Sequence, residues 1–365
     1  MARTGPFGHF GSFHRVGQWF PKIGVLELPG ERGATAPRWN VHEFHLHSEF
    51  YADYGHHDVR IDGPEGYTVN ATGEETDAPQ VRDGRVVHRF VQGDVHEFAW
   101  TADKRSAAPL EGLYNGAGSP PVKVKVLFPP EYPHNAAPVL KATLDALAYF
   151  PKTLGPYPYR TVTAVIPPFN ATEAGGMEYP TFFAAAGFRD ATPGRLASYA
   201  LDFGAIHEFG RGYCYGILGS NEFEAPMLDE GLNQFWDLRM LRERGQRVPL
   251  TTGTLRRFGI APLIKGFDAN RLMSGNGDPA DGLGQNAWDR LSTGSYARHA
   301  AIKVDDRVES LVSAEVLPLF GTTSSSGRWS ELTEEQRDER VEAARKAWKK
   351  PHPDARKNDA AGPFL

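Results

Sequence analysis

Cysteine is almost absent from this sequence of 365 residues, because Cys214 is the single one, which excludes an internal disulfide and a cysteine-rich zinc module. A charge excess is also lacking, since 40 basic and 45 acidic residues give a formal net charge of -5. Nucleic acids and anionic membranes therefore have no basic patch to bind. No apolar run reaches the roughly 20 residues of a membrane helix. We expect a cytoplasmic protein with neither a nucleic-acid partner nor a membrane segment, since residues 1–10 also lack a signal peptide's apolar stretch.

Several common catalytic motifs are missing as well. The sequence contains no G-x-S-x-G nucleophile elbow, no dinucleotide-binding G-x-G-x-x-G and no phosphate-binding loop. Cys214 has no neighbours in sequence that would activate its thiol, and it is predicted to be a core residue. Nucleophilic hydrolysis and nucleotide-dependent chemistry are therefore not indicated.

A histidine-rich stretch at residues 42–47 is the densest group of potential metal ligands. In a strand, Glu43, His45 and His47 would share one face, an arrangement that can bind a metal ion. Phe44 and Leu46 alternate with them, however, which is typical of a sheet with one polar face. We favour the polar sheet face.

The chain is long enough for two domains, and its patterns predict an α+β fold. Between residues 15 and 100, β-branched and aromatic segments alternate with turn residues, as in an antiparallel β domain. The alternating segment 122–128 predicts a strand that closes this region. We therefore predict a β domain at 1–130, a mixed α/β to helical domain at 131–320, and a charged helix with a disordered tail at 321–365.

Helical and strand patterns organise the second predicted domain. Apolar spacing predicts a helix from about residue 140 that Pro151 ends, followed by a strand at 161–166. A second helix is predicted around residues 196–217, and a third runs from 229 to about 244 with Gly245 as its stop signal. Those last two helices carry the residues that indicate chemistry.

The segment 207–211, His-Glu-Phe-Gly-Arg, contains most of an H-E-x-x-H zinc motif. In that motif the two histidines lie four residues apart on one helix face, and the glutamate between them activates a metal-bound water. His207 and Glu208 are present, but Arg211 stands at the second histidine position. Glu230, on the next predicted helix, would be the third ligand.

The sequence resembles the aminopeptidase N (alanyl aminopeptidase) family of gluzincin zinc metallopeptidases, especially its bacterial branch. Three motifs in order carry the resemblance: G-G-M-E-Y at 175–179, H-E-F-G-R at 207–211 and D-E-G at 229–231. Weaker matches at 18–22 and 48–53 extend it over roughly residues 15–310. This chain departs from the family pattern at Arg211. Members of the family also usually have more β domain before the segment at residue 18 and a helical domain after the catalytic one.

The resemblance implies a thermolysin-like catalytic domain, a zinc cofactor, and removal of N-terminal residues from peptides. In that interpretation Glu178 would bind the free α-amino group of the peptide, and Gly175 and Gly176 would leave room for its backbone beside a strand edge. His207 and Glu230 match zinc ligands, and Glu208 matches the general base.

The family also uses a tyrosine to stabilise the oxyanion, and Tyr296 is the nearest match by spacing. A slip of three or four residues would place His299 or Ala300 there instead.

Arg211 changes what this framework predicts. On a helix its side chain points the same way as that of His207, towards the expected metal position. Charges of +1 and +2 about 4 Å apart at a dielectric near 20 repel by up to about 8 kcal/mol. Arginine also cannot lose its proton to become a ligand. We therefore predict a zinc-free site in which Arg211 pairs with Glu208, Glu230 or both. The alternative is a zinc site completed by Cys214 or Glu224, or by Arg211 turning away.

Three functional hypotheses follow. The first is a metallopeptidase-like protein of this family whose zinc binding and activity Arg211 impairs. The second is an inactive peptide-binding or scaffold pseudoenzyme on the same fold. The third is a remnant without a folded function. The expected ligand is a peptide with a free N-terminus, and a protein partner is expected to cover the side that the family's missing domain would cover.

Overall fold

The computed structural model describes residues 7–41, 51–116, 119–169, 171, 174–222, 229 and 232–247. Two compact units divide the chain: Met1–Asn40, Ala52–Gly219 and Trp236–Ala269 form the first, and Val41–Tyr51, Ser220–Phe235 and Asn270–Leu365 the second. The described part is a mixture of helices and mostly antiparallel sheets, so the predicted α+β class is confirmed at this level. The predicted boundaries at 130 and 320 remain predictions, as does the helix after residue 333, which lies outside the described residues.

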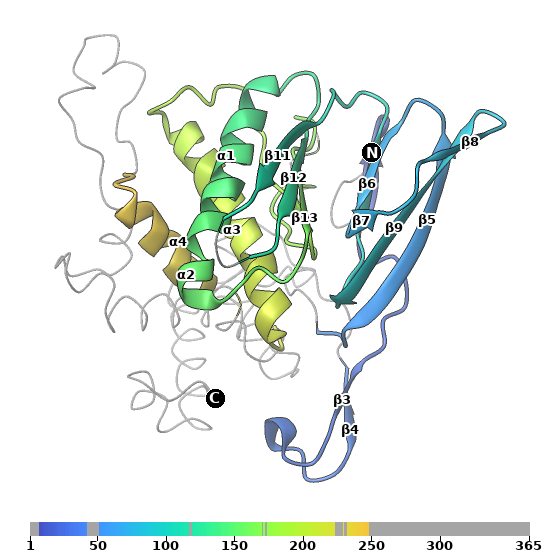
Figure 1. Cartoon of the computed structure of the whole chain (residues 1–365), viewed down its shortest axis with the longest axis vertical. Coiled ribbons are helices and arrows are strands. Elements are labelled where there is room, and N and C mark those ends of the chain that lie inside the picture. The colour runs from blue at the N-terminus through green and yellow to red at the C-terminus, as the bar shows by residue number, and fades with distance from the viewer. Residues whose placement is uncertain are drawn as a thin grey trace, which may run out of the picture. The chain divides into compact units, whose positions relative to one another are not determined.

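The N-terminal part of the first unit consists of strands in three sheets (Figure 1). The strands are β1 (Phe7–Phe10), β2 (Phe13–Val16), β3 (Val25–Glu27), β4 (Arg38–Asn40), β5 (Gly55–Pro64), β6 (Thr68–Ala71), β7 (Glu74–Glu75), β8 (Gln80–Arg82), β9 (Arg85–Val95) and β10 (Trp100–Asp103). One sheet has the order β1-β2-β10-β6, a second β5-β9-β7 with β8 also on β9, and β3 pairs with β4. All these pairs are antiparallel, as predicted.

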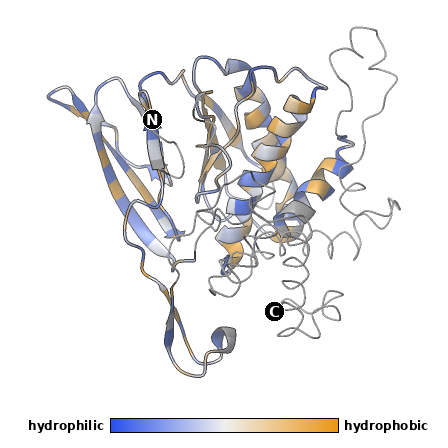
Figure 2. Cartoon of the chain, turned by 180° about the vertical axis from the view of Figure 1, so that it is seen from behind, coloured by the Kyte–Doolittle hydropathy of each residue, from blue (hydrophilic) through white to orange (hydrophobic). Residues whose placement is uncertain are grey.

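Alternation of polar and apolar residues explains the long strands β5 and β9 (Figure 2). Ile61 is buried and lies opposite His88 in the register of the pair. Its neighbours Arg60 and Asp62 point to the other face, because successive side chains of a strand alternate. The inward residues join Phe90 and Phe98 in a small apolar core, which holds this β region together.

A second region of the first unit combines a mixed sheet with helices (Figure 1). Its elements are β11 (Leu110–Tyr114), β12 (Val122–Leu127), α1 (Pro133–Tyr149), α2 (Pro151–Leu154), β13 (Thr161–Val165), β14 (Phe182–Ala184), α3 (Leu196–Leu218) and, from Trp236 onwards, α4 (Leu232–Glu243). The sheet order is β11-β12-β13-β14, with β12, β13 and β14 parallel. Helices α1 and α3 pack on each other, α1 against β11 and β12, and α3 against β14.

Burial of apolar side chains explains this packing. Val122, Val124 and Val126 alternate along β12 and are at most 1% exposed, and they meet Leu147 of α1 and Ile206 of α3 in one large core. The predicted strands at 122–128 and 161–166 and the helix at 196–217 are therefore confirmed. The prediction at Pro151 needs correction, because this proline begins the short helix α2 as well as ending α1.

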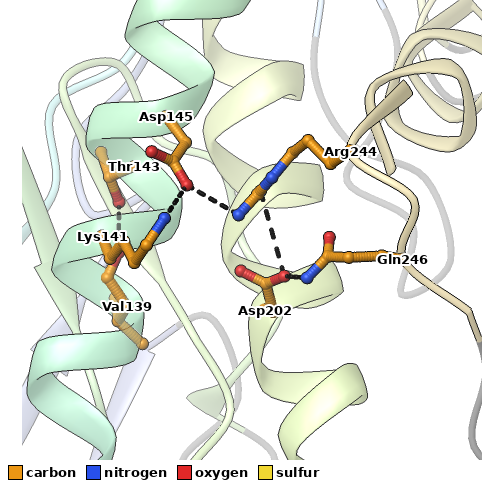
Figure 3. A network of polar contacts seen from close by, with 7 residues as sticks. All are labelled: Val139, Lys141, Thr143, Asp145, Asp202, Arg244 and Gln246. Carbon is orange, nitrogen blue, oxygen red and sulfur yellow. Dashed lines mark hydrogen bonds and ion pairs between the residues drawn. The ribbon is translucent and has the colours of Figure 1, made fainter. Parts of the chain in front are cut away.

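A network of charged side chains fastens the turn after α4 to two other helices (Figure 3). The Arg244 guanidinium lies 2.7 Å from an Asp145 carboxylate oxygen on α1 and 4.0 Å from Asp202 on α3. Gln246 donates a hydrogen bond to Asp202, and Lys141 lies 2.5 Å from Asp145 on the solvent side.

Arg244→Met is therefore expected to lower the free energy of unfolding by about 1 kcal/mol, because a partly exposed ion pair contributes little more than that. Lys141→Met is the matched control. Its ammonium shares Asp145 but is 70% exposed, so the loss should be close to zero. Urea denaturation of both variants measures the difference. Equal effects would show that the Arg244 ion pairs do not stabilise the packing of these helices.

Acid is expected to destabilise the fold through His96. Its ring is 4% exposed and lies 3.9 Å from the Tyr215 ring, centroid to centroid. Burial, with Lys22 and His57 adding to it, holds the pKa of His96 well below its ordinary value of 6.5. Below that pH the unfolded chain binds more protons than the folded chain, so stability present above pH 6.5 is lost as the pH falls.

His96→Phe tests this by removing the titrating ring while keeping an aromatic side chain. Wild type should lose up to about 1.4 kcal/mol more per pH unit than the variant between about pH 6.5 and 5. Burial also shifts the pKa values of two neighbours: it raises that of Glu97, whose effect on stability with pH has the opposite sign, and lowers that of His57. Both groups are present in both proteins, so the difference between the two slopes reports His96. Urea unfolding at several pH values measures the two slopes, and equal slopes would rule out His96 as the cause.

Among the described residues, no helix combines the length and apolar character needed to cross a lipid bilayer.

Candidate functional site

Helix α3 is the platform of the candidate site, because His207, Glu208 and Arg211 all lie on its middle turns. The helix ends at Leu218 and is capped by Gly219, whose φ of 52° is left-handed and whose N–H donates to the Tyr215 carbonyl at 3.0 Å. Ile206 and Phe209, on the buried side, fix the rotation of the helix about its axis. The site residues are therefore held by a rigid element.

His207 is oriented by an aspartate from the neighbouring helix. Its Nδ1 lies 2.8 Å from an Asp237 carboxylate oxygen on α4, and the two side chains are 12% and 0% exposed. The Phe203 ring stacks on the imidazole with 5.6 Å between centroids. The carboxylate at Nδ1 fixes the orientation of the imidazole ring, as in many histidines that bind metals. No sequence motif pointed to Asp237.

Arg211 forms a buried ion pair with Glu178. Its Nη2 lies 2.7 Å from Glu178 Oε1, and the two side chains are 3% and 2% exposed. The sequence predicted pairing with Glu208, Glu230 or both, which stays a prediction, and it did not predict the pair with Glu178. Gly212 explains it, since a Cβ there would lie 3.2 Å from the Glu178 carbonyl oxygen. The missing side chain lets α3 approach the 178 backbone closely enough for the two charges to meet.

The glycine segment before Glu178 lies beside β14. Gly176 has a φ of +74° and donates its N–H to the Ala184 carbonyl at 2.8 Å, while the Ala184 N–H bonds the Met177 carbonyl at 2.8 Å. A Cβ on Gly176 would lie 3.6 Å from Glu208 Oε1. Gly176, Glu178, Glu208 and Arg211 are therefore brought together, with Gly175 preceding them in the same segment.

Tyr179 and Arg15 extend this buried polar group. The Arg15 guanidinium, on β2, lies 5.3 Å from the Tyr179 ring centroid, and its Nη2 lies 3.5 Å from the tyrosine oxygen. Burial raises the pKa of Tyr179 to about 12, so the hydroxyl stays protonated at neutral pH. Gly17 makes room for it, because a Cβ there would overlap the Tyr179 hydroxyl. The sequence analysis did not identify Arg15. Its sole indication in the sequence is that a charged residue stands within a strand of alternating residues.

Several predicted residues lie outside the described part of the chain. These are Glu230, Tyr296 with the alternatives His299 and Ala300, Glu224, and the histidine cluster at 42–47. Cys214 is described and is buried on α3, as predicted for a core residue. In the second unit, the carboxylate oxygens of Glu222 and Asp229 lie within 4.8 Å of each other, and both residues are buried.

The donor set on α3 does not fit zinc. A zinc site needs four donors around the ion, three of them from protein in a catalytic site. Here His207 offers one nitrogen, while the position four residues later holds a buried guanidinium that is always protonated. No zinc-dependent step is therefore derived for this chain.

Comparison with known proteins gives only distant similarity. No protein-family model matches the chain, and no curated protein matches it. Among solved structures, it is similar to the M1 zinc metallopeptidase from Deinococcus radiodurans, with 14% identity and a TM-score of 0.42 over 93% of this chain and 70% of that one. A glutamate-to-alanine mutant of an M1 zinc metallopeptidase from the same organism shares 16% identity, with a TM-score of 0.40 over 80% of this chain and 64% of that one.

A two-domain M1 zinc metallopeptidase mutant bound to L-arginine gives 16% identity and a TM-score of 0.41, over 81% of this chain and 64% of that one. The chain thus spans 64% of the length of two of these three structures. Similarity of this degree assigns no activity to this chain.

Proposed function

We propose that this chain is a metallopeptidase-like protein of the aminopeptidase N type that does not catalyse zinc-dependent hydrolysis, and that it acts as a peptide-binding or scaffold protein. One observation carries the proposal: the Arg211 guanidinium is buried and paired with Glu178 at 2.7 Å. A permanent cation is thus fixed on the helix position that a second zinc histidine would need.

The same ion pair affects the group that would recognise a peptide end. In the resemblance, Glu178 binds the free α-amino group of the peptide, but here its carboxylate already has a cationic partner. A free N-terminus would have to share this carboxylate with Arg211 or displace it. Arg211 therefore has two effects: it removes a metal ligand, and it neutralises the carboxylate that would bind the amine. Together these effects favour a protein without peptidase activity over an enzyme with reduced activity.

One observation favours a second candidate, an aminopeptidase with metal held by a rescued ligand set. The bond from His207 Nδ1 to the buried Asp237 is the arrangement that commonly orients a metal-binding histidine. This candidate requires Arg211 to leave Glu178 when metal binds.

Metal content and turnover separate the two. Purified protein is loaded with zinc, exchanged into metal-free buffer and analysed for zinc by mass spectrometry, and alanyl-p-nitroanilide hydrolysis is measured with and without added zinc. The proposal expects far less than one zinc per chain and no hydrolysis above buffer. Stoichiometric zinc with metal-dependent release of nitroaniline would establish the enzyme instead.

A further inference from the structure

A cavity of about 440 Å³ opens on the β region of the first unit, and none of its lining residues belongs to the α3 site. It is lined by Gly8, His9, His14, Val16, Gln18 and Trp19. Its volume lies within the range of about 300–1,000 Å³ that small-molecule sites occupy. Neither a carboxylate nor an ammonium or guanidinium group is among these six described residues, which disfavours a strongly charged ligand.

Trp19 gives this cavity a flat aromatic wall that is fixed in place. Its indole N–H donates to the Phe98 carbonyl at 2.9 Å, and its ring meets Phe20 edge to face with 5.2 Å between centroids. The side chain is nevertheless 45% exposed. A tryptophan whose N–H is bonded and whose side chain is nearly half exposed can stack on a ligand without losing its own hydrogen bond.

Gln18 contributes an amide side chain from an unusual backbone conformation. Its φ of 53° is left-handed, a region that favours glycine. Gln18 lines the cavity, and its side chain can both donate and accept hydrogen bonds. Backbone strain of this kind often accompanies ligand-binding positions.

Two histidines complete the polar part of the wall. His9 and His14 lie opposite each other on β1 and β2, and their rings stack with 5.6 Å between centroids. Burial and the neighbouring His9 lower the pKa of His14, and Asp103 opposes this. A neutral His14 at pH 7 offers one donor and one acceptor instead of a charge.

We propose that this cavity binds a neutral pyranose ring of a carbohydrate. A pyranose has one apolar face, which stacks on an exposed indole, and a rim of hydroxyls, which pair with uncharged donors and acceptors. Trp19 would stack on the apolar face of the sugar, and Gln18 and His14 would form hydrogen bonds with its hydroxyls. An aromatic side chain of a peptide would use Trp19 but would leave the Gln18 amide and His14 unused, so it fits the wall less completely.

Ligand-observed NMR with the full chain tests this. The probes are the methyl glycosides of glucose, galactose and mannose at millimolar concentration, with N-acetyl-tyrosinamide as the peptide-like competitor. At least one glycoside should show saturation transfer. Gln18→Gly should weaken that binding at least about fivefold, the effect of one lost hydrogen bond, while its melting temperature equals or exceeds that of wild type because glycine suits the left-handed backbone.

Trp19→Leu should abolish binding, and Trp39→Leu is the matched control, because Trp39 is 60% exposed on β4 and does not line the cavity. Since Trp19 also bonds Phe98, Gln18→Gly decides the matter if Trp19→Leu loses its fold. The proposal is overturned if no glycoside binds, if only N-acetyl-tyrosinamide binds, if binding survives in Gln18→Gly, or if Trp39→Leu causes the same loss as Trp19→Leu.

Discussion

Arg211→His is expected to raise the affinity of the chain for zinc at least about 100-fold, because it adds a nitrogen ligand and removes a cation from the metal position. The replacement lies four residues after His207 on a helix that is already formed, so both imidazoles would face the same point. His207 is also already oriented by Asp237, which lowers the entropy lost on binding. The variant needs no change of fold to gain the ligand.

Competition with a zinc-binding dye measures this affinity, and two double variants show where the zinc binds. His207→Ala/Arg211→His should lose the whole gain, because a single imidazole remains. Glu208→Gln/Arg211→His should keep it, because Glu208 is a base and not a ligand in the H-E-x-x-H motif. If Arg211→His gains nothing, Arg211 is not what prevents zinc binding and the proposed cause of inactivity is wrong.

Local features of the site were predictable from the sequence. Apolar spacing placed α3 within a few residues of its bounds, and the helical period then put His207 and Arg211 on one face. Gly245 was expected to stop α4, and it has a φ of +68° two residues beyond the helix end at Glu243. Each of these follows from contacts within one or two turns of the chain.

The partners of the site residues were not predictable, because they come from distant segments. Nothing in the sequence near Arg211 indicates Glu178 as a partner. This contact depends on how closely α3 approaches the segment beside β14, which Gly212 permits. Asp237 and Arg15 were missed for the same reason, since each meets the site only through the packing of α4 or β2.

The Arg211–Glu178 pair also has a large expected effect on stability. Arg211→Met is expected to lower the free energy of unfolding by about 3–5 kcal/mol, because it leaves the Glu178 carboxylate in a buried position without its cation. Both side chains are at most 3% exposed, so water cannot replace the lost partner without opening the structure. Equilibrium urea unfolding followed by circular dichroism gives the value.

Arg239→Met is the matched control, because it removes an arginine from an ion pair of similar length, 3.0 Å to Glu243, whose side chains are 34% and 45% exposed. That loss should be about 0.5 kcal/mol or less, since an exposed pair of this spacing contributes little. The double variant Arg211→Met/Glu178→Leu should recover part of the stability that Arg211→Met loses, because replacing both charges avoids the unpaired carboxylate. If Arg211→Met were no more harmful than Arg239→Met, Arg211 would not be fixed on Glu178. The guanidinium would then be free to leave the metal position, and the inactive state proposed for this site would lose its physical basis.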